Sequence, residues 1–134
     1  MKIKSRFVLG VGFGLILAAV PAVAHHSFAA QYDRSKPNTL TGPVTKIEWI
    51  NPHARFFMDA KDDSGKVVNW EVELGPPAGL MRRGWSRNTL KVGESVTVNG
   101  FVAKDGSNLT NAQTVTLSDG KKVFAGSSAD GTNP

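Results

Sequence analysis

Residues 44–60 read VTKIEWINPHARFFMDA, and this stretch decides the fold. Asn51 and Pro52 predict a turn in its middle, because proline fixes its φ angle and lacks a backbone donor. The residues on both sides of the turn are rich in β-branched and aromatic side chains, which favour strands. The stretch also holds His53, one of only three histidines in the chain. It therefore predicts two strands joined at a turn that carries a histidine.

Further strand signals follow along the chain, separated by glycine, proline and aspartate turns. The alternation of apolar and polar residues is clearest over residues 67–74, where Val68, Trp70, Val72 and Leu74 fall on one face. Pro77 near the start and Gly84 past the end predict a short helix over residues 78–83. The predicted strands cover residues 39–50, 55–60, 67–74, 94–102, 109–117 and 121–124.

The first predicted strand contains a change of phase. Val44 falls on the opposite face from Ile47 and Trp49 if the strand alternates regularly. One extra residue in a strand restores such a phase, and glycine and proline often mark the position. We therefore expect a β-bulge near Gly42 and Pro43.

Three strands, one short helix and two or three further strands form the element order of an OB-like barrel. We predict an all-β fold, a small OB-like barrel of five to six strands with one short helix between strands three and four. An open β-sandwich is the alternative. The barrel is expected over residues 39–125, between an N-terminal arm at 25–38 and a flexible tail at 126–134. In the arm, Phe28 and Tyr32 are four residues apart and can share one helical face.

The first 24 residues have the pattern of a secretory signal peptide. Lys2, Lys4 and Arg6 form a basic start, an apolar run follows, and Ala22 and Ala24 supply small residues before a cleavage site. The apolar run is short for a membrane span, which needs about 20 residues. We therefore predict cleavage after Ala24, a periplasmic or secreted protein, and no stable membrane insertion.

Composition limits the classes of partner. Without the three cations of the signal, thirteen of the sixteen remain against eleven acidic residues, a balance of +2. There is no basic tract of the kind that binds nucleic acid. The sequence contains no cysteine, so a site for a soft metal must use histidine or methionine rather than thiolate.

Several segments together resemble an uncharacterised family of exported bacterial proteins, a domain of unknown function. The resemblance covers nearly all of the chain after residue 24 and implies membership without an activity or catalytic residues. The stretch from residue 90 to 100 and the preceding helix also resemble small exported barrels, some of which bind copper or other small ligands. The segments that carry the family resemblance are HHSFAAQYD (25–33), TLTGPVTKIEWINPHARFFMDA (39–60), NWEVELGPP (69–77), LMRRGW (80–85) and LKVGESVTVNGFVAKDGSN (90–108).

Cleavage after Ala24 makes His25 the N-terminal residue. A terminal histidine offers its α-amine and its imidazole Nδ1 to one metal ion, and His53 can supply a further imidazole. Such nitrogen ligation suits Cu(II), so copper is expected before zinc. His26 is an alternative ligand through the amine, the intervening amide and its own imidazole. The metal-free interpretation of the same residues is a frayed polar terminus and a histidine that only stabilises its turn.

Met58 offers a different copper site, a soft Cu(I) site with His53 and Trp49. Parity opposes it, because residues 53 and 58 fall on opposite faces of a regular strand. Core packing is the simpler interpretation of Met58. Trp70 is likewise predicted to face the core, with Val68 and Val72.

The second functional hypothesis needs no metal. Trp85 with Arg82, Arg83 and Arg87 predicts a basic and aromatic surface for a protein partner or an anionic ligand. We therefore predict a binding or accessory protein; a copper oxidase or oxygenase is a third hypothesis, without an identifiable substrate.

Glu71 and Glu73 lie two apart on one predicted strand face. Such a pair can act as an acid–base couple, but ion pairing with Arg55 or Lys66 on the adjacent strand is the simpler interpretation.

Overall fold

The computed structural model describes residues 28–126. The predicted signal peptide, His25, His26 and residues 127–134 of the predicted tail lie outside the described residues. A helical turn over residues 28–31 comes first. The named elements are β1 (Tyr32–Glu48), β2 (Arg55–Lys61), β3 (Val67–Glu73), α2 (Pro77–Arg82), β4 (Ser95–Ala103), β5 (Leu109–Thr116) and β6 (Lys122–Phe124).

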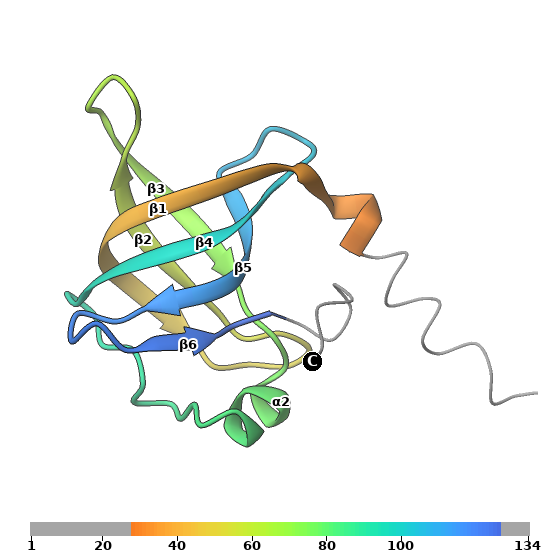
Figure 1. Cartoon of the computed structure of the whole chain (residues 1–134), viewed down its shortest axis with the longest axis vertical. Coiled ribbons are helices and arrows are strands. Elements are labelled where there is room, and N and C mark those ends of the chain that lie inside the picture. The colour runs from red at the N-terminus through yellow and green to blue at the C-terminus, as the bar shows by residue number, and fades with distance from the viewer. Residues whose placement is uncertain (1–27, 127–134) are drawn as a thin grey trace, which may run out of the picture.

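The strands curl into a closed ring (Figure 1). The sheet order is β3-β2-β1-β4-β5-β6, and a parallel pairing of β3 with β5 closes it. The start of β5 pairs with β3 through Thr110 and Asn111, while its end pairs with β6 through Thr114 and Val115. Closure leaves few open sheet edges. The prediction of an OB-like barrel of five to six strands is confirmed, with six strands present.

The barrel interior is filled by one face of each strand. In β2 the residues alternate strictly, with Phe56, Met58 and Ala60 buried and their neighbours more exposed. Val72, Val98 and Val115 reach the same interior from β3, β4 and β5. Trp70 is partly buried and packs against this core, as predicted. The apolar core is the main source of stability in a chain without disulfides.

The short helix predicted between strands three and four is present as α2, beneath one end of the barrel and opposite the β2–β3 loop (Figure 1). Pro77 occupies its first turn, where the missing N–H removes no helical hydrogen bond. Gly84, at φ 91°, follows its end. Leu80 anchors α2 to the core with 1% of its surface exposed.

The first strand begins at Tyr32, whereas the sequence predicted a start at Thr39 and an arm before it. Its register against β4 shifts between Tyr32 and Pro37, across the polar residues 33–36. The predicted start of the strand was too late, because the polar residues 33–36 gave no strand pattern although Tyr32 before them and Pro37 after them both pair with β4. Phe28 and Tyr32 do pack together, with ring centroids 5.3 Å apart.

The predicted bulge is present slightly later, between Val44 and Lys46, where the register of β1 against β2 shifts. Gly42 precedes it and has a separate role. A Cβ atom on Gly42 would lie 1.8 Å from the backbone oxygen of Asp59. Only glycine therefore allows β1 and β2 to approach so closely at this position.

We expect Gly42→Ala to destabilise the barrel by about 2 kcal/mol or more, because the added methyl group meets backbone rather than a movable side chain. The measurement is urea unfolding followed by tryptophan fluorescence. Gly79→Ala is the matched control. A Cβ atom on Gly79 would have the Arg82 Nη2 atom, 3.9 Å away at the end of a flexible side chain, as its nearest contact. Alanine also favours a helix over glycine. Equal unfolding midpoints for the two variants would contradict this account of β1 and β2.

Candidate functional site

His53 lies beside the end of β3. Its neighbour Ala54 accepts a hydrogen bond from the Leu74 N–H at 2.9 Å and donates one to the Gly75 carbonyl at 3.1 Å. These bonds bring His53 next to Glu73 on the outer face of the barrel. The imidazole Nδ1 lies 3.4 Å from Glu73 Oε1, and the His53 side chain is 36% exposed.

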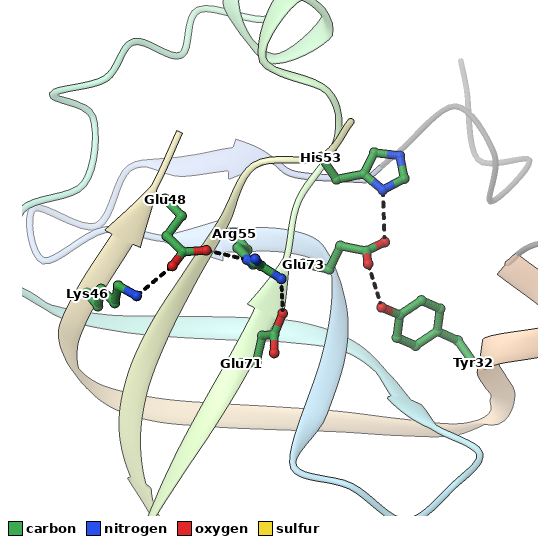
Figure 2. Close-up of polar contacts among 7 residues, drawn as sticks. All are labelled: Tyr32, Lys46, Glu48, His53, Arg55, Glu71 and Glu73. Atoms are coloured by element: carbon green, nitrogen blue, oxygen red, sulfur yellow. Dashed lines mark hydrogen bonds and ion pairs between the residues drawn. The ribbon is translucent and has the colours of Figure 1, made fainter. Parts of the chain in front are cut away.

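The Glu73 carboxylate contacts side chains from three other parts of the chain: Tyr32, Asn111 and His53. Tyr32 in β1 donates its phenol hydrogen to Oε2 at 2.8 Å, and Asn111 in β5 donates its amide to Oε1 at 3.2 Å. Figure 2 shows His53 and Tyr32 approaching the carboxylate from opposite sides. The Glu73 side chain is only 21% exposed, so these contacts replace much of its hydration. The carboxylate is thus held in one orientation toward His53.

Tyr32 is a buried partner in this group, with 2% of its surface exposed. Burial first, and then the negative charge of Glu73, raise the pKa of the Tyr32 phenol far above its ordinary value of 10.0. A phenol that keeps its proton remains a hydrogen-bond donor to Glu73. Phe28, Tyr32 and Ala103 form a small apolar cluster of their own, against which Phe101 and Leu109 pack.

A second polar group on the same face engages Arg55. Arg55 is directly opposite Glu73 in the strand register, yet its side chain bonds Glu48 and Glu71. Lys46 pairs with the other oxygen of Glu48, and these contacts of Lys46, Glu48, Arg55 and Glu71 are separate from the group around Glu73 (Figure 2). Hydrogen bonds from Lys46 and then from Arg55 lower the pKa of Glu48. Arg55 is therefore engaged elsewhere, and Glu73 is available to His53.

The predicted pairing of the two strand carboxylates is confirmed for Glu71, which accepts a bond from Arg55 at 3.0 Å. The sequence did not anticipate the group around Glu73. Tyr32 is 41 residues from Glu73 and Asn111 is 38 residues away. No local pattern indicates such contacts, since they arise only when the ring of strands closes.

The structure places one of the three predicted metal ligands, His53, while His25 and His26 are outside the described residues. Within residues 28–126 no group of three or more histidine, cysteine, aspartate or glutamate side chains is arranged to hold a metal ion. The described part of the chain thus supplies one exposed imidazole with a carboxylate partner. It does not supply a complete coordination sphere.

Met58 does not share a site with His53. Its side chain is fully buried in the barrel core, whereas His53 is on the outer face. The parity argument against a soft copper site is therefore confirmed. Trp49 is half-buried and packs against the core.

The predicted basic and aromatic surface is correct only in part. Arg82, Arg83 and Arg87 are exposed. Trp85 is buried, with 3% of its surface exposed, and its indole N–H donates to the Phe124 carbonyl at 2.9 Å. The expectation of a surface indole was wrong because the segment after α2 turns inward and packs Trp85 into the core.

These features define the class of protein: a small OB-like barrel with one histidine–carboxylate pair on its outer face. The chain belongs to a family of unknown function, DUF6152, whose sequence profile matches residues 14–112. This confirms the expected membership of an uncharacterised family. A search of curated proteins found no significant match to the chain. Among residues 28–126, no helix has the length and apolar character needed to cross a membrane.

We expect the unfolding free energy of the wild type to fall as the pH rises above 10. The raised pKa of Tyr32 means that the phenol loses its proton in the unfolded chain but keeps it in the folded one, so high pH favours unfolding. Tyr32→Phe should lose this pH dependence, and it should cost about 1–2 kcal/mol at neutral pH. The measurement is urea unfolding of both proteins at a series of pH values.

Tyrosinate absorbance provides a direct check, since Tyr32 is the only tyrosine in the sequence. Ionisation of this phenol in the folded protein near pH 10 would contradict the proposed burial and its contact with Glu73. An equal pH slope in Tyr32→Phe and the wild type would do the same.

Proposed function

We propose that the protein is an exported binding or accessory protein that binds a divalent metal ion, copper in preference to zinc. Its ligands are His53 and the N-terminal His25, with His26 as a further or alternative imidazole. Cleavage after Ala24 in the periplasm or during secretion creates the terminal amine of His25. The proposal is supported by the sequence pattern and by the geometry around Glu73.

One observation carries the proposal: Tyr32 and His53 contact the same carboxylate, Glu73. The start of the described chain is thereby held on the side of the barrel where His53 lies. The Phe28 side chain packs on Tyr32 and is 4% exposed, so the chain is anchored as far back as residue 28. From there His25 is three residues away, a stretch of at most ~10 Å.

Glu73 suits the role of a residue that orients a metal-binding histidine. A histidine that ligates a metal through one ring nitrogen usually donates the other N–H to a carboxylate or carbonyl. Here Nδ1 of His53 faces Glu73 Oε1 at 3.4 Å, and the other ring nitrogen points away from that carboxylate (Figure 2). We therefore assign Nε2 of His53 to the metal and treat Glu73 as a positioning residue.

The ligand set favours copper on chemical grounds. An amine and two imidazoles are nitrogen donors, which suit the square or T-shaped geometries of Cu(II). The order of stability among divalent ions also places copper above zinc for such donors. Both kinds of donor must lose a proton, at pKa values near 8 for the amine and about 6.5 for imidazole, so binding should weaken in acid.

Titration of the tag-free mature protein with Cu(II), followed by electron paramagnetic resonance, tests the proposal. The wild type should give a nitrogen-rich signal, and His25→Ala and His53→Ala should each weaken binding by at least about tenfold. An extra residue before His25 should weaken binding without changing stability, since it moves the amine away. A signal unchanged in both histidine variants would overturn the metal site.

The positioning role of Glu73 has a matched control in the neighbouring carboxylate of the same strand. Glu73→Gln should weaken Cu(II) binding by about 10-fold or more. A neutral amide accepts the Nδ1–H hydrogen bond more weakly than a carboxylate, so the imidazole becomes a less basic and less well oriented ligand. Glu71→Gln should leave binding near the wild-type value, since Glu71 contacts Arg55 rather than His53. Equal effects of the two substitutions would contradict the assignment.

The exposed arginines support the alternative function, an interaction module that needs no metal. Arg82, Arg83 and Arg87 are on the surface, where guanidinium groups pair readily with acidic groups of a ligand or protein. The surface differs from the predicted one in lacking the indole of Trp85. Its partner is therefore selected by charge rather than by aromatic stacking.

A further inference from the structure

Two of these arginines line a hollow of about 290 Å³ between α2 and the residues that follow β6. Residues in and next to α2 line it, among them Arg82 and Arg83, together with Gly126. None of the described residues that line the hollow is acidic. The charged side chains among these lining residues are those of Arg82 and Arg83.

The two sides of the hollow are tied to one another. The Gly75 N–H, just before α2, donates to the Ala125 carbonyl at 3.1 Å. Beyond α2, the Trp85 indole donates to the Phe124 carbonyl at 2.9 Å. Leu80, between these two bonds, is 1% exposed and fixes α2 to the core. The hollow is thus a shaped part of the fold and not a gap between independent loops.

The guanidinium groups have defined surroundings. Arg83 lies over the Phe124 ring, 5.7 Å from its centroid, and donates to the Gly126 carbonyl at 3.4 Å. Arg82 extends over Gly79, where a Cβ atom would lie 3.9 Å from the Arg82 Nη2 atom. Contact with a ring and a carbonyl restricts the rotation of Arg83, so less entropy is lost when a ligand binds.

We propose that this hollow binds the oxyanion group of a small ligand, a carboxylate or a phosphate. Guanidinium groups match the geometry of both anions and form strong charge-assisted hydrogen bonds with them. The volume is at the lower end of the range for small-molecule sites, which favours a small acid or phosphorylated compound over a large apolar ligand. The site is on α2, apart from His53, and does not depend on a bound metal.

Inorganic phosphate and acetate are the probes, added separately to the full mature chain at constant ionic strength with chloride as the reference. Binding is followed by backbone amide shifts of Gly79 and Gly126 in NMR spectra. We expect saturable shifts with at least one anion, and a loss of about tenfold or more in affinity in both Arg82→Gln and Arg83→Gln. The anion that binds more tightly identifies the ligand as phosphorylated or carboxylic.

Arg87→Gln is the matched control, because Arg87 is an exposed arginine of the same region that does not line this hollow. It should bind the anion like the wild type. Absence of saturable shifts with both anions would overturn the proposal, and so would equal weakening by all three substitutions, which would indicate general charge screening. Copper binding should be unaffected in Arg82→Gln and Arg83→Gln, so failure of one proposed site leaves the other to be judged by itself.

Discussion

The parallel pairing of β3 with β5 is the constraint on which the rest of the structure depends. It converts an open sheet into a closed ring and places Glu73 directly beside Asn111 in the register. Without it, the apolar faces of β3 and β5 would border solvent. Because β3 and β5 are separated by α2 and β4, closure also determines where α2 covers the barrel end.

The charged groups on the outer face form two separate sets of contacts, one around Arg55 and one around Glu73. Arg55 could pair with the facing Glu73, but it reaches diagonally to Glu71 and across to Glu48. Glu73 is consequently shared by Tyr32, Asn111 and His53. Exposed ion pairs like those of Arg55 contribute little to stability. Their effect here is to leave one carboxylate for the imidazole and the buried phenol.

The succession of strands along the chain, the short helix and most core residues could be predicted from the sequence, because apolar–polar alternation and turn residues act over a few positions. Val72, for example, is buried as its parity indicates. Two expectations were wrong for the same reason. The polar residues 33–36 concealed the early part of β1, and the arginines around Trp85 suggested a surface indole. In both cases long-range pairing or packing outweighed local polarity.

By itself the sequence determined the type of fold and the candidate chemistry of His53. The two-residue period of apolar and polar positions in a strand and the type of each residue are local properties. Only the tertiary structure decided which carboxylate meets that histidine and that Tyr32 joins it. Only the tertiary structure, too, brought Arg82 and Arg83 to one hollow with Gly126. The physical reason is that these contacts join residues about 20 to 45 positions apart along the chain, and the closed barrel alone brings them within bonding distance.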